Sequence, residues 1–519
     1  MPPLRRSLLC LLPLVVALTM PALACDQGRV FEDRDGDGRP GTGEPGLAGI
    51  RVSDGVRIVE TGVDGRFSGL DGRRAVVFVI KPAGYGVARD GALPRFWRPA
   101  GARGHACTFA LRPQAPEAAL DMLVFADPQA GREAEVGYYE RSVIARARDV
   151  PAMLGLTLGD VGNDVPALYP AINRATAQLD VPWLHLPGNH DLDFEAGDDP
   201  ASTASYRAVY GPETYAWEEA HASVLMLDNV IYQPGARPAY VGGLREDQFA
   251  FVEAYLAGAP TERLLVVGAH IPWFDTAAEG AAETVRSADR ARLFAMLQRF
   301  PHVLLLSGHR HTQRHVRHGP DSGWHGPMPL REYNVGAASG AFWSGAPDAD
   351  GIPAATMADG TPHGFASLRV EPGTGYRLDW HPARRHEDDP ASTGAMALHA
   401  PRVLRRGAYP AWGVYANVFM GQPDTRVEYR VGDGDWRPMR RVDRADPRLV
   451  MENVRDDTAT ALRGFDRSPE ADLSSHLWRG ALPTDLPVGT HTVDVRVFDP
   501  WHGERRASTA YRLDAWPED

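Results

Sequence analysis

The sequence predicts a mixed α/β domain flanked by two β-rich domains. Residues 116–375 alternate between apolar strand-like runs and helical segments, which is typical of a layered α/β fold. Residues 25–115 and 376–519 contain short β-branched runs separated by glycine and aspartate turns, which is typical of β-sandwiches. The fold class we expect is therefore α/β (α+β), with a β-sandwich at each end of the chain.

Residues 1–24 have the features of a secretory signal peptide. Arg5 and Arg6 supply the positive region, residues 8–18 the apolar stretch, and Ala22, Leu23 and Ala24 a small-residue cleavage site. We therefore expect a secreted, periplasmic protein. Cleavage would leave Cys25 first, and lipidation of this cysteine is the alternative, although alanine rather than leucine stands three residues before it.

The N-terminal segment, residues 25–115, carries two cysteines once the signal peptide is removed. Cys25 and Cys107 stand at the two ends of its β-rich region, and we predict a disulfide between them in an oxidising compartment. The alternative is two unpaired thiols.

The same segment contains a run of twelve residues, 33–44, that fits a calcium loop. Carboxylates occupy positions 1, 3, 5 and 12, and Gly38 occupies position 6, where the chain must turn sharply. The candidate ligands are Asp33, Asp35, Asp37, Arg39 and Glu44. The flanks resemble strands rather than helices, so a bound Ca²⁺ would have a structural role in a β-sandwich. The alternative is a solvated acidic turn.

The central segment alternates strands with helices and has polar residues at its strand ends. Strands are predicted within residues 120–129, 153–160, 181–191, 263–273 and 303–311, and helices within residues 133–147, 247–256 and 288–300. Five strings, most of them following an apolar run, contain metal-type residues: FADPQ, LGDVGND, PGNHD, VGAHIP and SGHRH. An α/β fold presents ligands in this way along the carboxyl edge of its sheet. The six candidate metal ligands are Asp127, Asp160, Asn189, His270, His309 and His311.

This donor set predicts a pair of metal ions. Two carboxylates, one amide oxygen and three imidazoles suit borderline divalent or trivalent cations such as Mn, Fe or Zn. Calcium would not favour three imidazoles, and a thiolate zinc site would need cysteines. We expect Asp160 to bridge both ions. Ligands of one ion would be Asp127, His311 and, as a weak carbonyl ligand, Gln129; ligands of the other would be Asn189, His270 and His309.

Such a metal pair suits hydrolysis of a phosphorus ester through a metal-bridging hydroxide. His190 follows Asn189 and is the candidate general acid, and we expect the adjacent Asp191 to orient its ring. Asn163 and Asp164 lie near Asp160 in sequence and are candidates for contact with substrate or with ordered water. A single histidine on an apolar strand is more often a core residue, and it is the joint occurrence of the strings that favours a metal site.

The strings resemble the motifs of the calcineurin-like metallophosphoesterase superfamily, which run D-x-H, GD-x-x-(N/D), GNH(D/E), a lone histidine and GHxH. Gln129 stands where the first motif has histidine. The resemblance implies a four-layer αββα sandwich for residues 116–375. The terminal segments resemble a secreted bacterial branch with β-sandwich domains at both ends.

We therefore predict a secreted dimetal phosphoesterase that acts on a small phosphomonoester or phosphodiester. The net charge of −12 argues against a stable nucleic-acid partner, and no later segment is long and apolar enough to span a membrane. The alternative is a cell-surface binding module with a weakly metallated, catalytically poor centre. Gln129 and the tryptophans concentrated in residues 376–519 motivate that alternative, since the tryptophans could bind a polymeric cell-envelope ligand.

Overall fold

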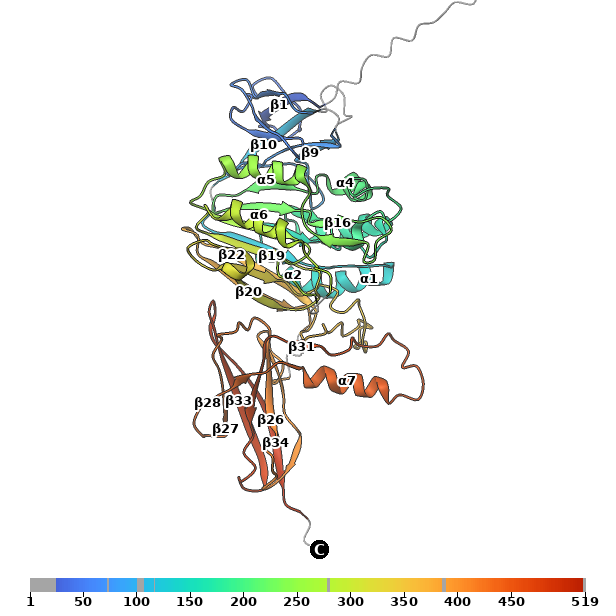
Figure 1. Ribbon diagram of the computed structural model, residues 1–519, viewed down its shortest axis with the longest axis vertical. Coiled ribbons are helices and arrows are strands. Elements are labelled where there is room, and N and C mark those ends of the chain that lie inside the picture. The colour runs from blue at the N-terminus through green and yellow to red at the C-terminus, as the bar shows by residue number, and fades with distance from the viewer. Residues whose placement is uncertain are drawn as a thin grey trace, which may run out of the picture.

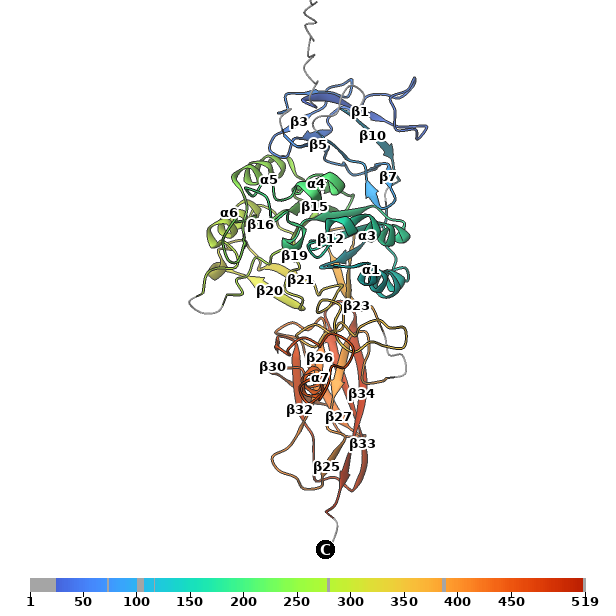
Figure 2. The ribbon, with the colours of Figure 1, turned by 90° about the vertical axis from the view of Figure 1, so that its right-hand side faces the viewer.

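The computed structural model describes residues 25–71, 74–99, 107–115, 117–277, 281–384 and 389–516. The predicted signal peptide, residues 1–24, lies outside the described residues. Three domains follow one another along the long axis: a small β domain, a central α/β domain and a second β domain (Figure 1). The view turned by 90° shows the same order (Figure 2).

The N-terminal domain is a pair of small sheets closed by a disulfide. One sheet has the order β4-β1-β10-β6 and the other the order β3-β2-β5-β9. Cys25 and Cys107 are joined, as predicted, with their Cα atoms 5.5 Å apart. The strands are β1 Gln27–Glu32, β2 Arg51–Ser53, β3 Ile58–Glu60, β4 Arg66–Ser68, β5 Val76–Val79, β6 Tyr85–Gly86, β7 Arg89–Asp90, β8 Leu93–Pro94, β9 Trp97–Pro99 and β10 Thr108–Pro113.

The central domain contains two sheets packed face to face. The first sheet has the order β13-β12-β11-β22-β23 and the second the order β14-β15-β18-β19-β21-β20. The first sheet is formed by β11 Leu120–Phe125, β12 Leu154–Leu158, β13 Trp183–Leu186, β22 Gly364–Val370 and β23 Tyr376–Pro382. The second is formed by β14 Tyr215–Glu218, β15 Ala222–Leu227, β18 Leu264–Ala269, β19 Val303–Ser307, β20 Arg314–His318 and β21 Leu330–Asn334.

Helices cover the outer face of each sheet, so the predicted four-layer αββα sandwich is confirmed. Side chains of both sheets, such as Val124 and Val266, share one buried core. A second core lies between the first sheet and its helices and includes Phe125, Tyr139 and Ile172. The helices are α1 Glu133–Tyr139, continued by a π turn Glu140–Ile144 and α2 Ala145–Ala147, then α3 Tyr169–Thr176, α4 Ala204–Tyr210, α5 Glu246–Gly258 and α6 Ser287–Leu297.

The direction of the inner strands brings their carboxyl ends together. β11, β12 and β13 pair in parallel, and so do β15, β18, β19 and β21. Every residue of β15 and β18 is buried, which explains their uninterrupted apolar sequences. A separate hairpin of β16 Val230–Tyr232 and β17 Tyr240–Gly242 follows β15.

The C-terminal domain is a β-sandwich with one helix, α7 Pro447–Asp457, that sequence reasoning missed. Its sheets have the orders β24-β26-β32-β29 and β25-β34-β33-β27-β28. The predicted boundary at residue 375 divides the paired strands β22 and β23, and the central sheet continues to Pro382. The strands are β24 Met396–His399, β25 Val403–Arg405, β26 Gly413–Val418, β27 Val427–Val431, β28 Arg437–Pro438, β29 Arg440–Arg441, β30 Arg444–Ala445, β31 Leu473–Ser474, β32 Leu477–Ala481, β33 Gly489–Asp499 and β34 Gly503–Asp514.

Candidate metal centre

The fold brings the six predicted metal-type residues to one edge of the two sheets. Asp127 follows β11, Asp160 follows β12, and Asn189 begins a short turn of 3₁₀ helix, Asn189–Asp191, after β13. His270 follows β18 directly, and His309 and His311 follow β19. Because these strands run in parallel within each sheet, their carboxyl ends meet where the sheets face each other.

The backbone at this edge is held in an unusual conformation. Five of the residues have positive φ: Asp127 (49°), Gln129 (45°), Asp160 (50°), His309 (70°) and His311 (48°). Residues with a Cβ atom rarely adopt left-handed conformations, and those that do cluster at sites where the surrounding structure imposes them. Each of the three strand ends therefore turns sharply enough to aim its polar side chains into the space between the sheets.

Four side chains form the first cluster of donor atoms. His270 Nε2 lies 3.0 Å from Asn189 Oδ1, 3.2 Å from His309 Nδ1 and 3.4 Å from Asp160 Oδ1. One ligand atom from each of Asp160, His270 and His309 lies within 4.8 Å of the others. The opposite nitrogen of the His270 ring, Nδ1, lies 2.8 Å from Leu158 O, which fixes the ring with Nε2 toward the cluster.

Asp127 and His311 form the second cluster. His311 Nε2 lies 3.6 Å from Asp127 Oδ1, and its Nδ1 lies 2.6 Å from the carbonyl of Gly340. The backbone N–H of His309 donates to both oxygens of Asp127, at 3.1 and 3.0 Å. Gln129 is 1% exposed, and among the described residues neither atom of its amide has a hydrogen-bond partner. A buried amide in this condition needs a ligand or water.

The charges of the site favour a cation. Burial alone would lower the pKa of His270, but the nearby carboxylates of Asp160 and Asp127 raise it to about 9. Burial opposes ionisation of Asp160, yet His270 holds the pKa of this carboxyl below its usual range. Burial and the neighbouring His270 lower the pKa of His309 to about 3, so this ring is a neutral nitrogen donor. Two buried carboxylates thus attract positive charge to a place that also holds imidazole nitrogens and an amide oxygen, and these residues fit a metal ion.

His190 is held by Asp164, not by Asp191 as the sequence had suggested. Its Nδ1 lies 3.0 Å from Asp164 Oδ1, and Asp164 N donates to His190 O at 3.0 Å. The His190 side chain is 28% exposed and its backbone N–H donates to Asp160 Oδ1 at 2.8 Å, so the ring lies at the solvent side of the cluster.

Asp191 has a structural role instead, because its carboxylate is completely buried and accepts four hydrogen bonds. It accepts hydrogen bonds from the backbone N–H of Val161, Gly162 and Gly188 and from the hydroxyl of Tyr169. Burial and the charge of Asp160 raise its pKa to about 6. The prediction that Asp191 orients the His190 ring is therefore wrong, since all of its near contacts are directed elsewhere.

Asn229 supports the site although sequence reasoning did not single it out. Its Oδ1 accepts the backbone N–H of His270 at 3.1 Å and of Ile271 at 2.9 Å, and its Nδ2 donates to Ile271 O at 2.7 Å. The signal was available, because Asn229 is another polar residue just past the end of an apolar strand, β15. Asn163, predicted to contact substrate or ordered water, lies at the margin of the site, and its backbone N–H donates to Ala130 O at 3.1 Å.

The predicted calcium loop remains a prediction. The carboxylates of Asp33, Asp35 and Asp37 come within 4.8 Å of one another. However, the Arg112 guanidinium lies 3.1 Å from Asp33, and Glu44 accepts the backbone N–H groups of Arg34 and Gly41. Local hydrogen bonds therefore account for part of this acidic turn.

A cavity of about 620 Å³ lies elsewhere, between the N-terminal and central domains. Lys81 is in its wall, 2.7 Å from Glu219, and is 1% exposed. None of the six metal-type residues lines this cavity. Among the described residues, no helix combines the length and the apolar character needed to cross a membrane.

Comparison with protein-family models gives a match at each end of the chain. A model of the C terminal of calcineurin-like phosphoesterase matches residues 332–504, and a model of the N terminal of calcineurin-like phosphoesterase matches residues 35–114. No curated protein sequence matches the chain. The segment between the two matched regions carries Asp127, Asp160, Asn189, His270, His309 and His311.

Two solved structures are similar to part of the chain. A purple acid phosphatase from yellow lupin (Lupinus luteus) seeds is 12% identical, with a TM-score of 0.38 over 65% of this chain and 67% of that one. The protein TT1561 of Thermus thermophilus is 11% identical, with a TM-score of 0.30 over 51% of this chain and 100% of that one. The two matched family models show that both ends of the chain are similar to the corresponding ends of calcineurin-like phosphoesterases.

Proposed function

We propose that the protein is a secreted phosphoesterase that uses two metal ions to hydrolyse a small phosphomonoester or phosphodiester. The observation that carries the proposal is the gathering of six metal-type side chains, from the ends of five strands, at one edge of the central domain. The similarity of both ends of the chain to calcineurin-like phosphoesterases supports the reaction class. The sequence of residues 1–24 supports secretion.

The contacts suggest how the donors divide between two ions. Asn189, His270 and His309 approach one another on one side of Asp160, and Asp127 and His311 approach each other nearby. Asp160 would serve both groups, because a carboxylate has two oxygens. Gln129, two residues after Asp127, would join the second group, and its side-chain amide, which has no hydrogen-bond partner among the described residues, would contribute its carbonyl oxygen. The ions, as Mn, Fe or Zn, would supply Lewis-acid stabilisation of the phosphoryl charge and a water-derived nucleophile at neutral pH.

His190 would donate a proton to the leaving oxygen. Asp164 fixes the ring through Nδ1, which leaves Nε2 as the nitrogen that can face a substrate. Because the ring is partly exposed and its backbone is bonded to Asp160, Nε2 can reach an ester held at the cluster. A substrate with a poor leaving group depends most on this proton.

The test is hydrolysis of two esters that differ in their need for an acid. The full chain is assayed with p-nitrophenyl and butyl phosphates and with the corresponding diesters, after chelation and again after addition of Mn²⁺, Fe²⁺ or Zn²⁺. We expect no turnover after chelation and recovery with metal. His190→Ala should lower kcat for the butyl ester by about 10²–10⁴-fold and for the p-nitrophenyl ester much less.

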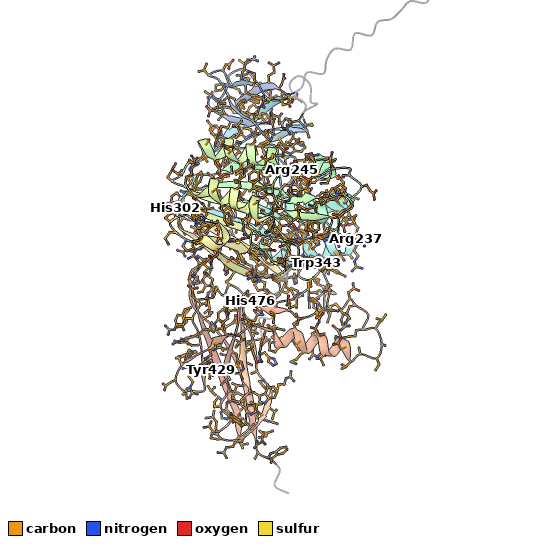
Figure 3. All side chains as sticks on the ribbon, viewed as in Figure 1. Arg237, Arg245, His302, Trp343, Tyr429 and His476 are labelled. Atoms are coloured by element: carbon orange, nitrogen blue, oxygen red, sulfur yellow. A yellow bond between two sulfur atoms is a disulfide. The ribbon has the colours of Figure 1, made fainter. Side chains whose placement is uncertain are left out.

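His302→Ala is the matched control, since His302 is exposed and lies at the side of the central domain (Figure 3). This variant should match the wild-type protein with both esters. Absence of turnover with every metal would overturn the proposed function. An equal loss with both esters in His190→Ala would overturn the role of His190 alone.

A second candidate function, binding of a polymeric cell-envelope ligand, is favoured by three exposed aromatic residues. Tyr409, Trp412 and Trp516 are 93%, 61% and 73% exposed. They belong to neighbouring segments, because β25 pairs with β34 and Trp412 O accepts the backbone N–H of Leu482. Trp412→Ala with Trp516→Ala in the full chain should abolish retention on peptidoglycan or polysaccharide. Absence of retention by the wild-type protein would exclude this candidate.

A further inference from the structure

An exposed aromatic ring lies directly against the proposed metal centre. The Phe342 side chain is 57% exposed, and its ring centroid is 4.7 Å from that of His311 with the planes tilted by 31°. Isolated exposed apolar residues are common on protein surfaces and usually need no explanation. Phe342 differs because its contact is with a candidate metal ligand and because its conformation is imposed.

The backbone around Phe342 is fixed in a left-handed conformation by its neighbours. Phe342 and Trp343 have φ of 54° and 55°, an arrangement that side chains with a Cβ atom avoid unless the surroundings require it. Trp343 is 2% exposed, and its indole Nε1 donates to the carbonyl of Pro128 at 3.1 Å. Figure 3 shows Trp343 in the part of the central domain nearest the C-terminal domain.

The other side of the same segment is anchored to His311. The carbonyl of Gly340 lies 2.6 Å from His311 Nδ1, and the backbone N–H of Ser339 donates to Asp127 O at 3.1 Å. The burial of Trp343 therefore leaves Phe342 projecting from a segment that is attached to both Asp127 and His311. These attachments hold the backbone at Phe342 next to the centre.

A second aromatic residue contacts the other histidine of the same turn. Tyr240 of β17 is half-buried, and its ring centroid is 5.9 Å from that of His309 in an edge-to-face arrangement of 84°. Tyr240 pairs with Tyr232 across the β16–β17 hairpin, and the Tyr232 ring is 6.0 Å from that of Phe194. His309 and His311 thus each carry one aromatic neighbour, from two elements that are distant in the sequence.

We propose that Phe342 and Tyr240 form an aromatic seat for the organic part of the ester, so that the preferred substrates carry an aromatic ring close to the phosphate. The inference rests on the proposed function, since the phosphoryl group must be held by the residues around Asp160 for the ring to reach this seat. Aromatic rings stack on one another in offset or edge-to-face arrangements, and a ring whose backbone is already fixed loses less freedom on binding than one on a mobile loop. Phe342 and Tyr240 determine specificity and take no part in bond breaking.

The test compares two esters with similar alkoxide leaving groups that differ in aromatic character. Benzyl and butyl phosphates, and their methyl diesters, are assayed with the metal-reconstituted full chain. We expect the wild-type protein to prefer the benzyl ester in kcat/KM by about tenfold, which corresponds to the worth of one aromatic contact. In Phe342→Ala the benzyl ester should lose about tenfold and the butyl ester almost nothing, so that the preference disappears.

Two further variants separate specificity from folding. Phe342→Tyr retains an aromatic ring and should retain the preference, whereas Phe342→Leu retains an apolar side chain and should lose most of it. Val488→Ala, which trims a 56% exposed apolar side chain in the C-terminal domain, should leave the ratio unchanged. Metal content and the melting temperature are measured for each protein.

The outcomes distinguish this inference from the proposed function. No turnover of either ester by the wild-type protein would overturn both. Turnover of both esters with the same benzyl-to-butyl ratio in Phe342→Ala and wild type would overturn the aromatic seat and leave the phosphoesterase intact. A nucleoside monophosphate is also assayed in place of the benzyl ester, so that the aromatic ring of the substrate is a nucleobase. A loss of kcat/KM in Phe342→Ala equal to that of the benzyl ester extends the seat to nucleotides, and no loss restricts it to smaller aryl groups.

Discussion

Replacing Asp191 by alanine is expected to destabilise the central domain more than any other change near the candidate metal centre. The carboxylate of Asp191 accepts four hydrogen bonds, from Val161 N, Gly162 N, Gly188 N and the Tyr169 hydroxyl, at 2.9–3.1 Å. It ties the loop after β12 to the loop after β13, the two loops that carry Asp160 and Asn189. Removing it leaves all four donors without an acceptor.

The size of the effect follows from these contacts. A buried donor left without an acceptor costs about 1–3 kcal/mol, so four cost about 4–12 kcal/mol in gross terms. Removing a buried charge offsets part of that cost. The pKa of Asp191 is raised from 3.8 to about 6, which corresponds to about 3 kcal/mol of unfavourable ionisation. Subtracting the second term from the first leaves a net loss of roughly 1–9 kcal/mol. The middle of that range, about 5 kcal/mol, lowers the melting temperature of a domain of this size by about 10–20 °C.

The assay is thermal unfolding at pH 8, where the carboxylate is ionised, with Asp164→Ala as the matched control. Asp164 is 49% exposed, and its hydrogen bonds among the described residues are with His190, so its removal should leave the melting temperature within about 2 °C of wild type. A wild-type melting temperature for Asp191→Ala, or a lower melting temperature for Asp164→Ala than for Asp191→Ala, would contradict the structural role of Asp191.

Three further predictions concern other parts of the chain. Asp164→Asn should lower kcat for an ester with a poor leaving group by about threefold to tenfold, because the His190 ring loses the carboxylate that orients it. Steady-state kinetics that show the same loss with p-nitrophenyl phosphate would argue against this orienting role of Asp164. Lys81 is the single lysine of the sequence and is 1% exposed. An amine-reactive reagent should therefore leave Lys81 unmodified in the folded protein and modify it in urea, as measured by mass spectrometry. Rapid modification without urea would show that Lys81 is accessible. Reduction of the Cys25–Cys107 disulfide, which joins residues 82 positions apart, should lower the unfolding free energy of the N-terminal domain by roughly 4–5 kcal/mol, and an unchanged urea midpoint would contradict this.

The central fold and the six metal-type residues could be predicted from the sequence because both depend on local sequence patterns. A buried parallel strand has an uninterrupted apolar sequence, and the polar residues just after it must lie at the sheet edge. The Cys25–Cys107 pairing was also predictable, since it joins the two ends of one β-rich segment.

Contacts between separate turns could not be predicted in the same way. Asp191 is the sequence neighbour of His190, but the 3₁₀ turn directs its side chain into the core, and Asp164 reaches the ring from another loop. The position of Phe342 depends on the burial of the next residue, Trp343, which no local pattern indicates. Helix α7 is a different case, because Asp446 at its N-cap followed by Pro447 is a local start signal that reasoning from β patterns overlooked.

The most direct test of the central claim is the number of metal ions bound at the cluster. The chelated full chain is titrated with Mn²⁺ by calorimetry, beside a chain carrying both Asp160→Asn and His270→Ala. We predict that the wild-type chain binds two more Mn²⁺ ions than the double variant does, and that turnover appears as these two ions bind. Identical binding by the two proteins, together with undiminished turnover by the variant, would contradict the assignment of a dimetal phosphoesterase centre to these residues.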